Sequence, residues 1–206
     1  MFRRTSHLVL GLALLLTPTL SAASADFDFQ DAKGVNAIYF LLDSELEPIM
    51  GLASGITGKL SFDPAAPNAT TGKIVVAANT IHFENERMTE KLFTEEWLDV
   101  QKHTEITFEF KEIKDVKSTD NVHKMSVVGD FTCRGVTKSI SAPVQATFLK
   151  DRLADRLRGQ KGDLLVLRSE FSISRKDFGI KPDMSTAIVA DEIRVRVLIV
   201  GAHAKN

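Results

Sequence analysis

Hydrophobic and polar residues alternate one by one along much of the chain, which is typical of β-strands with one buried face. The alternation is clearest in residues 105–110 (EITFEF), 170–174 (EFSIS) and 193–199 (IRVRVLI). An antiparallel sheet with one face on a core produces this pattern, whereas a surface helix would repeat every three to four residues. The period of two therefore predicts an antiparallel β protein.

Further segments have the strand pattern, and turn residues such as Asp63-Pro64 and Arg134-Gly135 separate them. They are Asn36–Leu42, Thr57–Asp63, Lys73–Ile81, Lys124–Cys133 and Lys138–Phe148. About eight short strands in one domain predict a closed barrel or a sandwich.

Two segments break the alternation and predict short helices. Residues 85–98 place Met88 and Leu92 four apart, with Trp97 about a turn further on, and Asn85 can cap the start. This helix either lids one end of the barrel or packs on its outside. In residues 149–157 a leucine recurs every fourth position, which predicts a second, shorter helix before a basic loop.

The first 25 residues have the pattern of a secretory signal peptide. Arg3 and Arg4 precede an apolar run over residues 8–16, and Ala23-Ser24-Ala25 provides small residues for cleavage after Ala25. The alternative is an uncleaved membrane anchor, but nine apolar residues fall well short of the ~20 that a spanning helix needs. We therefore expect one domain over residues 26–206, periplasmic or secreted, with no stable membrane span.

Composition and charge narrow the function classes. The 206 residues are 44% hydrophobic and 26% charged, so the chain can form a globular core. The formal net charge of −1 gives no support to a nucleic-acid-binding surface. A single Cys excludes an internal disulfide framework, and the oligomeric state stays open.

Candidate chemistry is sparse. His82, His103, His123 and His203 show no metal-ligand spacing, so no metal site is predicted. No nucleophile-elbow, P-loop or dinucleotide-binding motif occurs in the sequence. Cys133 ends a predicted strand beside an arginine, and we interpret it as a bystander thiol rather than a nucleophile. We predict no catalytic residues and a protein that is not an enzyme.

An apolar-faced barrel of about eight strands can enclose one small or slender ligand. An apolar lining suits an acyl or isoprenoid chain, and the alternative is a filled core without a cavity. Composition alone does not separate these two.

Four segments, in order along the chain, resemble the YceI-like family of exported lipid-binding barrels. They are residues 58–64 (GKLSFDP), 80–108 with its EWLD and TEITF steps, 128–138 (VGDFTCRGVTK) and 171–180 (FSISRKDFGI). The resemblance implies a lipocalin-like closed antiparallel barrel whose long apolar pocket holds a polyisoprenoid, a quinone tail or a similar lipid. It implies no catalysis, and no cofactor beyond such a lipid.

Two segments depart from the family pattern. Residues 42–55 are apolar and acidic and lack the histidine often found around the first hairpin, and residues 149–162 differ from the usual glycine-rich loop. Both departures concern the pocket mouth and the contacts of a lipid headgroup.

Strand parity supplies candidate pocket residues. The inward rows are Ile106, Phe108 and Phe110; Phe171 and Ile173; and Val195 and Val197. Phe62, Phe131 and Phe148 join them as aromatic candidates, although their parity does not fix which way they face. The alternative for all of these residues is plain core packing.

Arg175 shares the parity of Phe171 and Ile173, which places a cation at one end of the predicted pocket. One hypothesis is that it meets a phosphate or a quinone oxygen of the lipid. The alternative is an ion pair with Asp177 or another acid.

Three functions compete at this point. The leading prediction is an exported, non-catalytic carrier of an apolar lipid. The second is a partner-binding or stress-response barrel with a filled core. The third, a lipid hydrolase, lacks a nucleophile motif.

Overall fold

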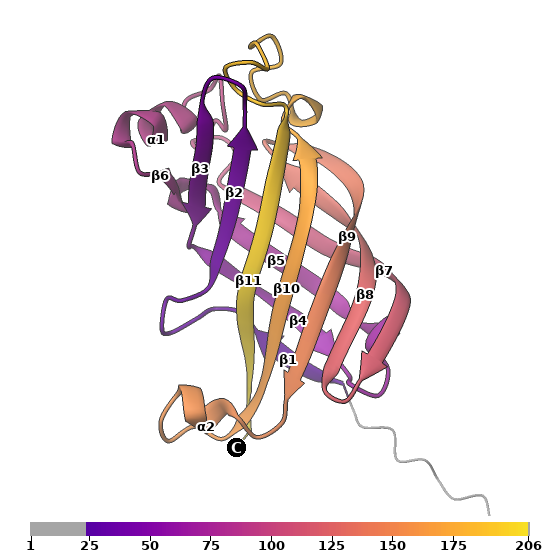
Figure 1. Ribbon diagram of the computed structural model, residues 1–206. Helices are drawn as coiled ribbons and strands as arrows, with labels where there is room; N and C mark the ends of the chain where they lie inside the picture. Colours follow the sequence, from indigo (N-terminus) through magenta and orange to yellow (C-terminus); the bar gives the residue numbers. More distant parts are fainter. Residues whose placement is uncertain (1–23, 206) are drawn as a thin grey trace, which may run out of the picture.

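The computed structural model describes residues 24–205, so the predicted signal peptide falls outside the described residues except at its end. The described part forms one antiparallel sheet (Figure 1). Its strands are β1 (Ala25–Asp28), β2 (Ala37–Asp43), β3 (Pro48–Ala53), β4 (Ile56–Phe62), β5 (Thr71–Ala77), β6 (Ile81–Phe83), β7 (Glu105–Thr119), β8 (Val122–Cys133), β9 (Val136–Leu149), β10 (Gly162–Ser174) and β11 (Glu192–Ala204).

Eight of these strands close into a ring. The order is β1-β4-β5-β7-β8-β9-β10-β11, and β1 closes it by pairing with β11 at Asp28 and Ala202. The longest pairing joins β10 to β11 without a register shift, from Gly162 opposite Ala204 to Ser174 opposite Glu192. The prediction of a closed antiparallel barrel with about eight strands and short helices is confirmed.

The wall of the barrel changes along its length because β11 has two neighbours on one side. Near its end β11 pairs with β1, whereas residues 194–198 pair with β2. β2 continues into β3 and β6, so these three strands form the wall at one end of the barrel (Figure 1). β11 therefore borders β1 at one end of the barrel and β2 toward the other.

The sequence did not reveal β1, β3 or β6 as separate strands. The predicted strand Lys73–Ile81 is interrupted by a turn at residues 78–80, where the Thr80 hydroxyl donates to the Ala77 carbonyl (2.7 Å). The chain thus leaves β5 and enters β6, which pairs with β3 instead. Short strands of three to six residues carry too few alternations to be recognised locally.

The helices are short and lie at opposite ends of the barrel (Figure 1). α1 (Glu86–Leu92) begins where the Asn85 side chain accepts a hydrogen bond from the Arg87 backbone N–H (3.0 Å). It is shorter than predicted, because residues 93–103 form successive turns. α2 (Leu153–Arg156) lies at the other end, near β10 and the C-terminus. Within residues 24–205 no helix has the length and apolar composition needed to cross a membrane.

The α2 end of the barrel is filled by its own side chains. Phe27 is fully buried, and its ring packs edge-on against Phe62 and Phe148, with ring centroids 6.4 and 6.2 Å away. Leu60 and Leu165 are fully buried in the same core. Interlocking aromatic rings of this kind fill the interior around Phe27.

His123 lies in this packed end, and it makes stability depend on pH. It is 2% exposed, its ring centroid is 5.5 Å from that of Phe62, and its Nδ1 is 2.8 Å from the Ser118 hydroxyl. Burial lowers the pKa of His123, whereas the unfolded chain binds a proton near the ordinary pKa of 6.5. The unfolded state therefore gains protons first as the pH falls.

We expect the free energy of unfolding to fall by up to about 1.4 kcal/mol per pH unit below about pH 6.5, down to the lowered folded pKa. Urea unfolding at several pH values between 7.5 and 5.5 measures this slope. His123→Phe removes its contribution, whereas the exposed His82→Gln control retains it. An unchanged slope in His123→Phe would contradict the assignment.

Candidate functional site

The α1 end of the barrel encloses a cavity of about 420 Å³. Its walls come from β2, β3 and β5 to β11, from α1 and the turn after it, and from the loop over residues 175–191. Its volume falls within the range of about 300–1,000 Å³ that is usual for small-molecule sites. The lining is almost entirely aliphatic and aromatic.

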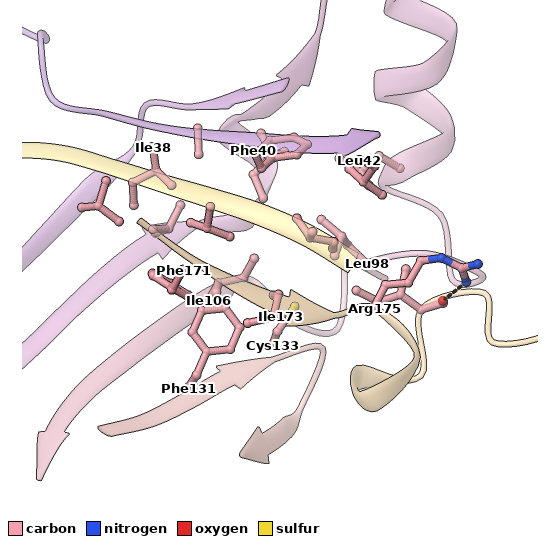
Figure 2. Close-up of a pocket in the computed structure, with 18 of the residues that line it drawn as sticks. Ile38, Phe40, Leu42, Leu98, Ile106, Phe131, Cys133, Phe171, Ile173 and Arg175 are labelled. Carbon is pink, nitrogen blue, oxygen red and sulfur yellow. Dashed lines mark hydrogen bonds between the residues drawn. The ribbon is translucent and has the colours of Figure 1, made fainter. Parts of the chain in front are cut away.

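Most of the pocket residues predicted from the sequence line this cavity. They are Ile106, Phe108, Phe110, Phe131, Phe171, Ile173, Arg175, Val195 and Val197. Figure 2 shows Ile38, Phe40 and Leu42 projecting from β2 on one side and Phe131 on the other. The alternation thus identified the inward face of these strands, and whether the residues contact a lipid remains a proposal.

Phe131 connects β8 with β10 and with the turn that follows β10. Its ring packs edge-on against Phe178 at 5.3 Å and against Phe171 at 6.4 Å between centroids. Phe62 and Phe148 also point inward, but they lie in the packed α2 end and do not line the cavity. An inward direction does not fix the depth of a side chain in the barrel, so Phe62 and Phe148 face the interior without bordering the cavity.

Sequence reasoning missed a large part of the lining. Alternation within β2 could have identified Ile38, Phe40 and Leu42, and the helical spacing of Met88 and Leu92 could have placed α1 on the wall. The two interpretations of the first helix are a lid at one end of the barrel and a helix packed on the outside. The structure supports the first, because Met88 and Leu92 of α1 line the cavity. Apart from Arg175, no local pattern distinguishes the lining residues of the 175–191 loop, which are Ile180, Met184, Ile188 and Val189.

A glycine shapes the wall opposite β7. Gly51 pairs directly with Phe40, and a Cβ atom added at Gly51 would lie 2.1 Å from the Cζ atom of Phe40. The Phe40 ring therefore lies across the glycine, where it packs edge-on against Phe83 at 5.5 Å between centroids. Any larger residue at position 51 would push this ring away from the sheet.

Arg175 is fully buried and organises the loop that follows β10. Its Nε donates to the Ala190 carbonyl (3.0 Å), Nη1 to the carbonyls of Ile180 (3.0 Å) and Lys181, and Nη2 to those of Met184 (2.9 Å) and Val189 (3.0 Å). These bonds use all five N–H donors of the guanidinium.

This geometry differs from both hypotheses for Arg175. Within the described chain it has no ion pair, and its donors are already bonded to backbone carbonyls rather than facing a headgroup (Figure 2). Burial lowers the pKa of Arg175, and the charge of Asp191 partly opposes this shift. Arg175 therefore acts as the structural centre of the 175–191 loop.

The 175–191 loop forms a roof over the cavity. It is joined to the β2–β3 hairpin, where the Leu46 N–H donates to the Ala187 carbonyl (2.9 Å) and the Ser44 hydroxyl to that of Ile188 (2.8 Å). On the other side, Lys181 pairs with Glu96 in the turn after α1 (2.5 Å). The roof is thus fixed to both neighbouring walls.

Few polar groups face the cavity. The Ser169 hydroxyl, on the lining of β10, already donates to the Pro143 carbonyl (2.7 Å). Lys91 and Glu47 contribute charged side chains, and Trp97 an indole. Among residues 24–205 no group of three metal-binding side chains occurs. The site suits an apolar ligand with at most a few polar contacts.

Cys133 lines the cavity and is 3% exposed. Burial raises the pKa of its thiol from 9.0 to about 12, although the charge of Arg134 partly opposes this. At pH 8 we expect a maleimide to label Cys133 in the folded protein about a hundredfold or more slowly than in urea, because the thiolate is the reactive form. Mass spectrometry of timed aliquots measures both rates, and equal rates would contradict the buried placement.

The family model of the YceI-like domain matches residues 35–200. The chain belongs to the YceI-like family. Among its YceI-like relatives, a UPF0312 protein of Yersinia enterocolitica is 26% identical over an alignment that covers 100% of both chains.

Solved structures agree with the YceI-like fold. Burkholderia cenocepacia BcnA superimposes with a TM-score of 0.66 at 17% identity, over 80% of this chain and 95% of that one. A polyisoprenoid binding domain from Saccharophagus degradans superimposes with a TM-score of 0.61 at 10% identity, over 87% and 99% of the two chains. At these identities the likeness concerns the fold.

Proposed function

We propose that this YceI-like protein is an exported, non-catalytic carrier that holds one long apolar lipid inside its barrel. The observation that carries the proposal is the cavity of about 420 Å³ with an almost wholly aliphatic and aromatic lining under an anchored roof. A polyisoprenoid or the tail of an isoprenoid quinone has the shape and polarity that this space accepts.

The hydrophobic effect provides enough free energy for such a ligand. Each buried methylene group contributes about 0.8 kcal/mol, so about ten of them contribute about 8 kcal/mol before the costs of association. Aromatic side chains from three walls, such as Phe40, Phe131 and Phe171, would contact the chain. The structural likeness to the polyisoprenoid binding domain of Saccharophagus degradans supports the same class of ligand.

Two further observations support the rest of the proposal. The buried Cys133 thiol stays protonated at neutral pH, which does not suit a nucleophile.

Residues 1–25 have the pattern of a signal peptide, which supports a periplasmic or secreted location. Fractionation of cells, with N-terminal sequencing of the exported chain, tests the location: an intact N-terminus in the cytoplasm would contradict it.

Native mass spectrometry of the protein purified from its own cells tests the carrier function. We expect a complex with one lipid per chain, and organic extraction of the same sample identifies that lipid. A ligand-free mass, with no uptake during incubation with isoprenoids, would refute the carrier and favour a partner-binding barrel.

A further inference from the structure

Trp97 carries a buried hydrogen-bond donor at the edge of the cavity. Its indole lines the cavity and packs against a small cluster of Leu42, Ile49 and Val189. The Nε1 atom is buried and finds no acceptor anywhere in the part of the chain that the structure describes. The donor is therefore shielded from solvent, and the protein does not satisfy it.

The position of this donor is held by the backbone. The backbone N–H of Trp97 donates to the Thr94 carbonyl (3.0 Å). The backbone N–H of the next residue, Leu98, donates to the Leu92 carbonyl at the end of α1 (3.0 Å). The ion pair of Glu96 with Lys181 fixes the preceding residue to the roof of the cavity. Trp97 is thus anchored on both sides.

An unsatisfied donor at this place has an energetic cost. A buried N–H without a partner typically costs about 1–3 kcal/mol, and most buried polar groups in native proteins are bonded. Phenylalanine would fill a similar apolar position without this cost, and Phe40 and Phe83 do so on the same side of the barrel. Because an indole only donates, the missing partner has to be an acceptor.

We propose that the lipid presents an acceptor oxygen to Nε1 of Trp97, so that its polar end lies beside α1 and its chain extends toward Phe131 and Phe171. This inference rests on the proposed carrier function and adds the polarity and orientation of the ligand. Lys91, on the last turn of α1, also lines this part of the site and provides a cation near the oxygen. Arg175 does not compete for this role, since all its donors are bonded.

Two probes of matched shape test the inference: geranylgeraniol, and a hydrocarbon with the same branched chain but no oxygen. Displacement of a fluorescent apolar dye measures both affinities. We expect Trp97→Phe to weaken binding of the alcohol about tenfold, equivalent to about 1.4 kcal/mol, and to change binding of the hydrocarbon less than twofold.

Phe171→Leu on β10 is the matched control, because it removes aromatic bulk from the lining without removing a donor. This substitution should weaken the binding of the alcohol and of the hydrocarbon by similar factors. Equal losses for both probes in Trp97→Phe would overturn the inference and leave the carrier function standing. If neither probe binds the unaltered protein, the carrier function and the inference fail together.

A second measurement needs no substitution. The chain has one Trp, so the ¹⁵N-labelled protein gives a single indole N–H signal. We expect the alcohol to move this proton signal downfield, as a new hydrogen bond requires, and the hydrocarbon not to do so. The same shift with both probes, or no shift with either bound, would overturn the inference.

Discussion

Replacing Arg175 by alanine is expected to lower the free energy of unfolding by about 3–5 kcal/mol. Five backbone carbonyls lose their donors at once, and each buried carbonyl left without a partner costs about 1–3 kcal/mol unless water reaches it. The 175–191 loop should loosen to admit that water. Urea unfolding measures the loss, and hydrogen exchange of the loop amides shows where it arises.

Arg175→Lys is expected to recover little of this stability, because an ammonium has three donors on one atom and cannot span carbonyls on several sides. Arg196→Met is the matched control, since Arg196 is exposed on the neighbouring strand β11. It should change the free energy of unfolding by less than about 0.5 kcal/mol. Equal stability of the Arg175→Ala and Arg196→Met variants would show that Arg175 does not hold the loop.

Filling the cavity is expected to abolish most lipid binding. Ala142 on β9 is 2% exposed and lines the cavity, so Ala142→Phe places a ring where the proposed lipid chain would lie. A ring that displaces about four methylene groups of the lipid reduces the favourable free energy of binding by about 3 kcal/mol. This loss weakens binding about a hundredfold. Because the ring enters existing space, the free energy of unfolding should change by less than about 1 kcal/mol.

Ser141→Phe is the control for this substitution. Ser141 precedes Ala142 on the same strand and is exposed on the outer face of the barrel. Titration of geranylgeraniol into both variants compares the affinities, and only Ala142→Phe should lose binding. Full binding by Ala142→Phe would show that lipid is held elsewhere.

The class of fold and the inward direction of many side chains could be predicted from the amino-acid sequence alone. Alternation is a local property, and in an antiparallel strand every second residue faces the same side. Ile106, Phe108 and Phe110 could therefore be assigned to the interior from six residues of sequence, and the structure places all three on the cavity wall. The short helix after Asn85 was predictable for the same reason, because its cap and spacing are local.

Which part of the interior forms a cavity follows from the folded structure and not from any local sequence pattern. Phe62 and Phe131 both face inward, but Phe62 lies among rings contributed by β1 and β9, whereas Phe131 borders the cavity. Depth in a barrel depends on how strands far apart in the sequence are staggered, and no local pattern contains that information. The same holds for β3 and β6, which are recognised as strands through their pairing.

Arg175 and Trp97 illustrate this limit at the level of single side chains. The sequence placed Arg175 at one end of the pocket, but its role follows from five carbonyls that the folded loop directs at one guanidinium. The unsatisfied indole of Trp97 likewise becomes visible only when every neighbouring acceptor has a position. The sequence therefore indicates which side chains face inward and that they are apolar. The shape of the cavity and its few polar contacts depend on how segments far apart in the sequence come together in the fold.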